Sequence, residues 1–382
     1  MPQVHPTPAS KRVVLLIYSL GGGGAERVSA ILMNRWVQAG HQVTLLTMSG
    51  TGEESYPLHG DVQRVALGLD QISASSVGAV FNNLRRLWRL RRTLRALRPD
   101  VTLAMMSTSA ILLGLASTSK SGLLLGSERS HPPALPLGRI WEWLRRRAYG
   151  RLDAVVAQTE PSAQWIREHT RARHVVVIHN PLDWPLPRQS PELLPTSQLA
   201  VDRRVVLAVG RLAREKQFEH AIQAFARLAN DFSGWDLVIL GEGPKRAELE
   251  ALVQRLSLEG RVHLPGRVGN LADWYARADL YVMTSLYEGF PNTLMEALAS
   301  GLPCISYDCD TGPRDLIRPG VDGEVIPPQD LEQLTRSMSG LMADHARRAA
   351  MGDQASQTRD RFSMARVGAE WDALLNLPGR PA

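Results

Sequence analysis

Short apolar runs alternate with amphipathic stretches along the whole chain. In the first half, apolar runs at 13–20 and 43–47 flank a helical pattern at about 25–39, which ends at Gly40. Further apolar runs occur at 101–104, 122–126, 154–158 and 175–178. Strands joined by helices form parallel sheets of the doubly wound type, whose ligands bind at the carboxyl ends of the strands. The first half is therefore predicted to be a doubly wound α/β domain.

The same alternation begins again near residue 205. Apolar runs are found at 205–209, 237–240, 262–264, 280–283, 303–306 and 323–326, with helical patterns between them. Repeated prolines between 181 and 195 interrupt regular structure, so we place an interdomain linker there. We predict an α/β protein with two Rossmann-like doubly wound domains facing across a cleft, which is the default ligand site. The predicted parts are a first domain at 1–184, a linker at 185–203, a second domain at 204–357 and a C-terminal segment at 358–382.

The most informative local pattern is S-L-Y-E-G-F-P-N-T-L-M-E-A-L-A-S-G-L-P at 285–303, where a strand is followed by a loop and a helix. Thr293 and Glu296 have the spacing of a capping box, which is a purely structural interpretation. The alternative is a ligand site, because a glycine-containing loop that enters a helix offers N–H groups and a positive dipole end to an anion. Glu288 and Glu296 can then accept hydrogen bonds from the hydroxyls of a ribose or hexose. Local chemistry alone leaves both interpretations open.

Two other loops follow predicted strands. Four glycines at 21–24 follow the first strand, but no register fits G-x-G-x-x-G, because Glu26 or Arg27 stands where the third glycine belongs. A close approach of the backbone to a phosphate or a sugar is the better interpretation. In the second half, Arg211 and Lys216 follow the first strand. Such residues are often merely solvated, but at the carboxyl end of a parallel sheet they can clamp a diphosphate.

Composition restricts the class of protein. A chain of 382 residues with 44% hydrophobic and 21% charged residues is typical of a globular protein with two domains. Cys304 and Cys309 have no histidine nearby at zinc-finger spacing, which indicates a reducing compartment in which both are ordinary core or loop residues. The apolar run at 13–20 is too short to span a membrane and leads into glycines instead of a cleavage site, so we expect no targeting segment.

Charge is distributed unevenly along the chain. Residues 1–200 contain 23 Lys and Arg against 13 Asp and Glu, whereas residues 201–382 contain 21 against 25. Arginines accompany leucine and tryptophan in two amphipathic stretches, at 84–98 and 139–151. One interpretation is a pair of surface helices with solvated arginines. The other is contact with an anionic membrane surface, where each basic side chain contributes about 1 kcal/mol. No nucleic acid is expected as a partner, because no recognisable binding module accompanies the charge.

Three segments together resemble the retaining nucleotide-sugar glycosyltransferases of family 4, which have the GT-B fold. They are G-R-L-x-x-x-K from Gly210, the E-x(7)-E segment at 288–303, and Asn-Pro-Leu-Asp at 180–183. The resemblance covers nearly the whole chain, and the E-x(7)-E segment is its most specific part. The Ser-Glu-Arg sequence at 127–129 is similar to members that build bacterial surface polysaccharides or lipid-linked oligosaccharides.

The resemblance implies a role for each candidate site residue. Arg211 and Lys216 would bind the donor diphosphate, Glu296 the ribose and Glu288 the donor sugar, while backbone N–H groups at the start of the helix would meet the distal phosphate. His131 would lie near the donor sugar, with Glu128 and Arg129 as alternatives. The expected catalytic residues are Glu288, Arg211, Lys216 and His131. The expected donor-binding residues are Gly22, Gly23, Gly24, Arg267, Val268, Phe290, Asn292, Thr293, Leu294 and Glu296.

The implied reaction moves a hexose or N-acetylhexosamine from a UDP-sugar to a lipid-linked or polysaccharide acceptor. No metal and no cofactor besides the UDP-sugar substrate is implied, and neither glutamate is expected to act as a glycosidase nucleophile. The expected location is cytoplasmic, peripheral on the inner face of the plasma membrane. A helix near the C-terminus, at 362–377, would cross back to the first domain. The alternatives are a nucleotide-sugar epimerase or phosphorylase of the same fold, or a non-catalytic membrane-associated protein.

Overall fold

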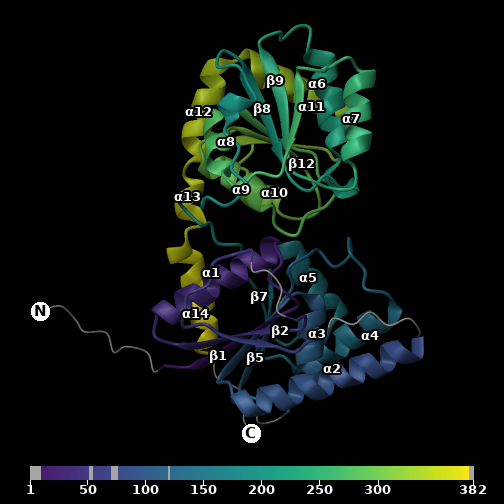
Figure 1. Cartoon of the computed structure of the whole chain (residues 1–382), viewed down its shortest axis with the longest axis vertical. Helices are drawn as coiled ribbons and strands as arrows, with labels where there is room; N and C mark the ends of the chain where they lie inside the picture. The colour runs from purple at the N-terminus through teal and green to yellow at the C-terminus, as the bar shows by residue number, and fades with distance from the viewer. Residues whose placement is uncertain (1–9, 51–54, 70–75, 119–120, 378–382) are drawn as a thin grey trace, which may run out of the picture. The chain divides into compact units, whose positions relative to one another are not determined.

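The computed structural model describes residues 10–50, 55–69, 76–118 and 121–377. The chain forms two compact units. Unit 1 consists of residues 1–179 together with 367–382, and unit 2 consists of residues 180–366. Each unit contains one parallel sheet with helices on both of its faces (Figure 1). The predicted pair of doubly wound α/β domains is therefore confirmed.

In the described part of unit 1, a seven-stranded sheet has the order β3-β2-β1-β4-β5-β6-β7. All neighbouring strands pair in parallel, for example Val13 of β1 with Val43 of β2 and with Val101 of β4. The strands are β1 (Arg12–Ile17), β2 (Gln42–Thr47), β3 (Gln63–Ala66), β4 (Val101–Met105), β5 (Leu123–Ser127), β6 (Ala154–Ala157) and β7 (Val175–Val177). The helices are α1 (Gly24–Gln38), α2 (Ser76–Leu97), α3 (Ser107–Ala116), α4 (Arg139–Ala148), α5 (Glu160–His169) and most of α14 (Met364–Leu375), with a 3-10 turn η1 (Tyr149–Arg151).

The sequence pattern missed β3. This strand lies at the edge of the sheet, and in its Gln-Arg-Val-Ala sequence only Val65 is half-buried while the other side chains are exposed. An edge strand with so little buried surface carries almost no hydrophobic signal. The first predicted strand, at 13–20, is shorter in the structure because β1 ends at Ile17 and Tyr18 is exposed.

Unit 2 has a six-stranded sheet of order β10-β9-β8-β11-β12-β13, again with every pairing parallel. The strands are β8 (Arg204–Val209), β9 (Trp235–Leu240), β10 (Val262–Gly266), β11 (Leu280–Met283), β12 (Cys304–Tyr307) and β13 (Gly323–Ile326). The helices are α6 (Phe218–Leu228), α7 (Arg246–Arg255), α8 (Leu271–Arg277), α9 (Asn292–Ala299), α10 (Pro313–Leu316), α11 (Leu331–Ala343), α12 (His345–Ala355) and α13 (Thr358–Arg361). Two 3-10 turns complete the unit, η2 (Pro195–Ser197) and η3 (Arg214–Lys216).

Helix α6 illustrates why these elements form. Its buried residues Phe218, Ala221, Ile222 and Phe225 recur at the i, i+3, i+4 and i+7 positions, so they share one helical face. That face packs on β8 and β9 in the same core as α7 and α11. Burial of a side chain the size of Phe225 contributes about 2 kcal/mol, which exceeds the helix-propensity differences among residues other than glycine and proline, at most about 0.7 kcal/mol.

The predicted linker at 185–203 lies within unit 2. Leu186 and Leu199 are buried in the core on the α8 side of the sheet, and the Trp274 indole donates a hydrogen bond to the Leu193 carbonyl at 2.9 Å. Prolines exclude regular hydrogen bonding from this segment, but they do not prevent its leucines from burying apolar surface. The boundary between the units consequently falls earlier than predicted, between His179 and Asn180.

The end of the chain returns to unit 1. Helix α14 lies beside α1 (Figure 1), and from Val367 onward it belongs to unit 1. Asp372 of α14 accepts hydrogen bonds from the Arg35 guanidinium at 2.6 Å and from the Trp36 indole at 3.1 Å. Because Trp36 is fully buried, its indole N–H requires an internal acceptor, and Asp372 supplies it.

A buried carboxylate on β9 joins three basic side chains of unit 2. Asp236 lies 2.5 Å from the Arg203 guanidinium, 3.2 Å from that of Arg261 and 3.3 Å from the His263 imidazole. Burial alone would raise the pKa of Asp236, but hydrogen bonds from His263 and Arg203 outweigh it and lower the pKa to about 2. The ionised carboxylate therefore stabilises the fold at neutral pH.

We expect Asp236→Asn to lower the free energy of unfolding by about 2 kcal/mol at pH 7, from the depressed carboxyl pKa. The unfolded carboxyl has a pKa near its ordinary value of 3.8, so the stabilisation is complete above that pH and disappears as the pH falls towards 2. Urea unfolding of both proteins from pH 7 down to pH 3 tests this, with the exposed Asp231→Asn as control. If the difference in unfolding free energy between wild type and variant stayed constant with pH, the ionised Asp236 carboxylate would not be the source of the stabilisation.

Candidate functional site

The loop between β11 and the start of α9 forms the centre of the candidate site in unit 2. Pro291 is the residue before the first helical turn, and no side chain caps this helix. The Thr293 hydroxyl instead accepts a hydrogen bond from the Tyr281 hydroxyl at 2.9 Å. The capping-box interpretation of Thr293 and Glu296 is therefore wrong, because Thr293 already lies inside α9. The first turn of α9 has no side-chain competitor for an anion.

Backbone packing fixes where this loop enters the helix. Gly312 has a left-handed backbone with φ of 99°, and a Cβ at this position would lie 2.3 Å from Cδ of Pro291. A side chain here would therefore push Pro291, and with it the start of α9, out of place. The Thr311 hydroxyl next to it donates a hydrogen bond to the Glu288 carbonyl. The loop after β12 thus supports the loop after β11.

Two predicted ligand residues from different loops meet directly. The Lys216 ammonium on η3 lies 2.5 Å from one carboxylate oxygen of Glu288, and both side chains are largely shielded from solvent. The Ser285 hydroxyl donates to the same oxygen at 2.7 Å. The Thr284 hydroxyl also donates to the Lys216 carbonyl at 2.8 Å, which ties the loop after β11 to the backbone of η3. An opposite-charge pair is thus held at the carboxyl ends of β8 and β11.

The other predicted residues of unit 2 divide into exposed and buried groups. Arg211 follows β8 and Arg267 follows β10, and both side chains are exposed at the carboxyl edge of the sheet. Phe290, Leu294 and Val268 are buried in the core, so only their backbone atoms can face a ligand. Asn292 begins α9 and accepts a hydrogen bond at 2.7 Å from the Asn180 side chain.

Glu296 is buried inside unit 2, with 2% of its surface exposed. The Tyr275 hydroxyl on α8 donates to one of its carboxylate oxygens at 3.2 Å and lies 3.1 Å from the Thr293 carbonyl. Tyr275 itself is almost completely buried. Tyr275 therefore fixes the orientation of this carboxylate, whose predicted role is to accept from ribose hydroxyls.

In unit 1 the predicted glycines lie between β1 and α1. Gly22 has a left-handed backbone with φ of 101°, Gly23 precedes the helix, and Gly24 is its first residue. The loop after β5 contains Arg129, whose guanidinium is influenced by the charge of Glu26 in the first turn of α1. Burial lowers the pKa of the Arg129 guanidinium to about 10, against the opposing effect of Glu26.

Glu128 and His131, two of the candidates after β5, have different surroundings. Glu128 is buried and accepts hydrogen bonds from Ser107, from Ser130 at 3.2 Å and from the Tyr149 hydroxyl at 2.7 Å. Its carboxylate is thus part of the internal hydrogen bonding of unit 1. Burial, and after it the charge of Glu128, raises the pKa of Tyr149. His131 is 8% exposed, and its Nδ1 lies 3.0 Å from the Ser162 hydroxyl on α5.

Sequence reasoning missed the residues that position the charged ones. Ser285 and Thr311 hold Glu288, Tyr275 holds Glu296, and Tyr281 holds Thr293. Only Ser285 had a local signal, since it precedes Glu288 by three residues in the same loop. The others come from distant parts of the chain. Within the described residues, no group of three or more His, Cys, Asp and Glu side chains has an arrangement that could hold a metal ion.

The chain matches two family models. Residues 22–184 match "Glycosyltransferase Family 4", and residues 190–358 match "Glycosyl transferases group 1". The chain is 26% identical over 370 residues to the amylovoran biosynthesis glycosyltransferase AmsD of Erwinia amylovora, covering 96% of this chain and 99% of that protein. It is 26% identical over 366 residues to a Campylobacter jejuni α-1,4-N-acetyl-D-galactosaminyltransferase named for an undecaprenol-linked acceptor, covering 95% and 98%.

Two further similarities differ in extent. The chain is 34% identical over 289 residues to an exopolysaccharide phosphotransferase of Streptomyces coelicolor, which covers 75% of this chain but only 29% of that protein. Among solved structures, HepE of Anabaena in complex with UDP and glucose has a TM-score of 0.79 and 20% identity, covering 96% of this chain and 100% of that one. This last similarity concerns the fold.

The two glycosyltransferase family models match consecutive parts of the chain, essentially one on each doubly wound unit, and together they define the class of protein. The chain belongs to the family 4 glycosyltransferases of the GT-B type, as the sequence motifs predicted. It is a glycosyltransferase. Its similarity extends to bacterial enzymes of polysaccharide and lipid-linked oligosaccharide synthesis.

The Lys216–Glu288 pair should be energetically coupled, because partial burial strengthens its attraction. A double-mutant cycle of Lys216→Ala and Glu288→Ala is expected to give a coupling energy of about 1 kcal/mol in chemical unfolding. The matched control is the exposed Arg227–Glu332 pair of the same unit, where a coupling close to zero is expected. Equal coupling in the two cycles would show that the site pair is no more than a surface contact.

Proposed function

We propose that this protein transfers a hexose or N-acetylhexosamine from a UDP-sugar to a lipid-linked or polysaccharide acceptor, with retention of anomeric configuration and without a metal ion. The observation that carries the proposal is the contact between Lys216 and Glu288 beside the uncapped start of α9. A cation and a helix N-terminus suit a diphosphate, and an adjacent carboxylate suits the hydroxyls of a sugar.

Relatives support the choice of donor and acceptor. The Campylobacter jejuni enzyme is named for N-acetylgalactosamine transfer to an undecaprenol-linked acceptor, and AmsD for amylovoran synthesis. HepE was solved with UDP and glucose. The names of the two relatives point to a glycan acceptor, and the ligands in the HepE structure suit a UDP-sugar donor. We propose both for this chain.

In the proposed mechanism, Lys216 changes its partner when the donor binds. Its ammonium leaves Glu288 for the diphosphate, together with the exposed guanidinium of Arg211, and Glu288 becomes free to accept hydrogen bonds from the donor sugar. As the bond from the anomeric carbon to the UDP oxygen breaks, negative charge grows on the diphosphate. Lys216, Arg211 and the N-terminus of α9 stabilise that charge without further reorganisation.

The acceptor hydroxyl attacks the anomeric carbon from the face that UDP leaves. A new carbon–oxygen bond forms to the acceptor, and the hydroxyl proton passes to an oxygen of the departing phosphate. This route requires no protein nucleophile, which agrees with the role of Glu288 in binding sugar hydroxyls. Glu296, held by Tyr275, binds the ribose and so fixes the position of the nucleotide.

Lys216→Ala is expected to lower kcat by about 10²–10³-fold, the usual cost of removing one preorganised donor to a developing anion. Glu288→Ala should lower kcat/KM for the donor sugar, because its hydroxyls lose an acceptor. The measurement is UDP release from a panel of UDP-sugars in the presence of EDTA and a lipid-linked acceptor. NMR of the product gives its anomeric configuration.

The matched control is Arg214→Ala, an exposed arginine on the same 3-10 turn as Lys216, which should leave turnover unchanged. Inverted product or activity only with added metal would refute the proposed mechanism. An epimerised sugar without transfer would instead favour an epimerase.

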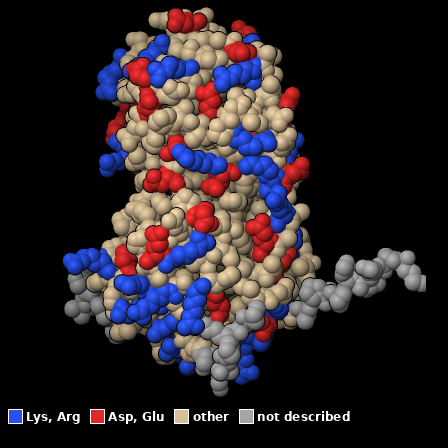
Figure 2. Space-filling view, turned by 180° about the vertical axis from the view of Figure 1, so that it is seen from behind, with Lys and Arg blue, Asp and Glu red and all other residues tan. Residues whose placement is uncertain are grey.

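The membrane part of the proposal rests on exposed apolar side chains in unit 1. On α2, 60% of Leu84 and 60% of Trp88 are exposed, and on α4, 75% of Ile140 and 54% of Trp143. Arginines accompany both tryptophans, with the Arg147 guanidinium 3.8 Å from the Trp143 ring centre. Figure 2 shows Lys and Arg side chains gathered over unit 1. Exposed tryptophan with neighbouring arginine suits the interface of an anionic bilayer.

No helix in the described part of the chain is long and apolar enough to span a bilayer. Because α2 and α4 expose apolar side chains beside arginines, we propose peripheral attachment to the anionic inner face of the plasma membrane through these two helices. The double variant Trp88→Ser/Trp143→Ser should lose most binding to vesicles that contain phosphatidylglycerol, and wild-type binding should weaken as salt increases. Sedimentation with the vesicles measures this. Trp184→Ser, an exposed tryptophan of unit 2, is the control, and equal losses in both proteins would exclude α2 and α4.

A further inference from the structure

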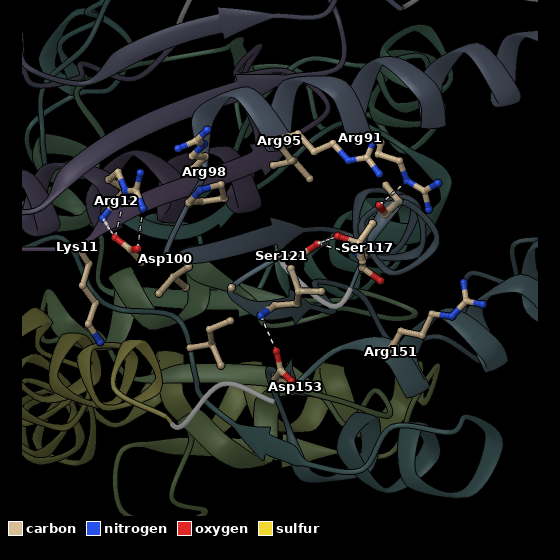
Figure 3. A pocket seen from close by; sticks show the side chains of 18 of the residues that line it. Lys11, Arg12, Arg91, Arg95, Arg98, Asp100, Ser117, Ser121, Arg151 and Asp153 are labelled. Atoms are coloured by element: carbon tan, nitrogen blue, oxygen red, sulfur yellow. Dashed lines mark hydrogen bonds and ion pairs between the residues drawn. The ribbon is translucent and has the colours of Figure 1, made fainter. Parts of the chain in front are cut away.

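A cavity of about 1550 Å³ lies in unit 1 at the amino ends of β1, β4 and β5 (Figure 3). The predicted ligand loops follow the carboxyl ends of the same strands, so the cavity lies at the opposite edge of the sheet. Its basic lining residues are Lys11, Arg12, Arg91, Arg95, Arg98 and Arg151. Its acidic lining residues are only Asp100 and Asp153.

Helix α2 and the residue directly after it bring three of these arginines to the cavity. Arg91 and Arg95 stand at i and i+4 on α2, so they share one helical face, and Arg98 follows the last helical residue, Leu97 (Figure 3). The buried Leu90 and Leu94 hold the helix on the core of unit 1. Arg98 ends the helix in a left-handed backbone with φ of 46°, a conformation that costs energy for any residue with a side chain.

Several of the charges are already compensated within the protein. Arg12 pairs with Asp100 at 3.0 Å, and Asp153 accepts a hydrogen bond from the Leu124 backbone at 2.7 Å. The Lys11 ammonium donates to the Leu375 carbonyl and to the Asn376 side chain, and Arg91 donates to the Ala116 carbonyl at 3.1 Å.

Three guanidinium groups have no such compensation. Across the described residues, the side chains of Arg95, Arg98 and Arg151 form no hydrogen bond or ion pair with protein groups. The opposite wall adds hydroxyls, since Ser121 and Thr118 lie 3.1 Å apart and either can act as donor. Like charges repel when they share one cavity, and an anion bound between them would remove that repulsion.

We propose that this cavity binds a phosphate monoester or diphosphate group. Guanidinium groups match phosphate oxygens with pairs of parallel hydrogen bonds, and serine and threonine hydroxyls complete the donor set. The phosphate group can belong to the headgroup of an anionic phospholipid or to a free phosphate-bearing molecule. The site is separate from the proposed donor site in unit 2, and its existence does not depend on the proposed reaction.

The test is calorimetric titration of the full chain with inorganic pyrophosphate. Arg95→Ala/Arg98→Ala should weaken the affinity at this site by about a hundredfold, because each charge-assisted contact contributes roughly tenfold. The control Arg255→Ala/Arg336→Ala removes two exposed arginines of unit 2 and should retain wild-type affinity. Lys216→Ala is titrated in parallel, because pyrophosphate can also occupy the donor site. Unchanged binding in Arg95→Ala/Arg98→Ala, or complete loss of binding in Lys216→Ala, would overturn the proposal.

A second variant covers the possibility that the alanine variant misfolds. Arg95→Lys/Arg98→Lys keeps both charges but removes the planar fork, so its affinity should lie between those of wild type and the alanine variant. Affinity of the lysine variant equal to that of the alanine variant would point to misfolding or to loss of helix packing, and would count against a phosphate site.

Vesicle binding distinguishes the two sources of phosphate. Vesicles of phosphatidylcholine with phosphatidic acid are compared with phosphatidylcholine alone, using wild type and Arg95→Ala/Arg98→Ala. Arginine-dependent binding to phosphatidic acid assigns the cavity to lipid headgroups. Pyrophosphate binding without any arginine-dependent vesicle binding assigns it to a free phosphate compound. If the protein shows neither pyrophosphate binding nor arginine-dependent vesicle binding, the proposed site is refuted. The variant Trp88→Ser/Trp143→Ser should keep pyrophosphate binding whether or not the membrane proposal holds.

Discussion

The described strands of both sheets all pair in parallel, and this pairing dictates where the loops of each unit lie. In a parallel sheet each strand must be followed by a crossover to the other end, so all loops after strands gather at one edge. In unit 2 this brings η3, which follows β8, against the loop that follows β11, although Lys216 and Glu288 are 72 positions apart in the chain. Their contact follows from strand order and cannot arise from local sequence.

The same constraint gives unit 1 two chemically different edges. At the carboxyl edge are the glycine loop before α1 and the loop with Glu128 and His131, where the Glu128 carboxylate is buried and hydrogen-bonded and His131 contacts Ser162. At the amino edge α2 ends, and its arginines face an open cavity. A parallel sheet therefore separates a preorganised, neutralised region from a strongly cationic one within a single unit.

Much of the candidate site consists of groups that hold other groups. Ser285 and Thr311 bond Glu288 through its carboxylate and its carbonyl, while Tyr275 bonds Glu296. These supporting contacts come from three different connections of the sheet. They hold one carboxylate in the loop before α9 and the other inside α9 in defined orientations. A site that must stabilise charge without reorganising depends on such support.

Most of the strand and helix pattern, the two doubly wound domains, the family and the E-x(7)-E segment could be predicted from sequence, because hydrophobic periodicity and short motifs are local properties. The sequence did not reveal β3, whose edge position buries too little surface, or the packing of 185–203 on unit 2, where leucines outweigh the prolines. Three features required the folded chain: Thr293 does not cap its helix, Glu128 is buried inside unit 1, and Lys216 contacts Glu288. Each depends on which side chains approach from distant segments, and strand order, not neighbouring sequence, sets those distances.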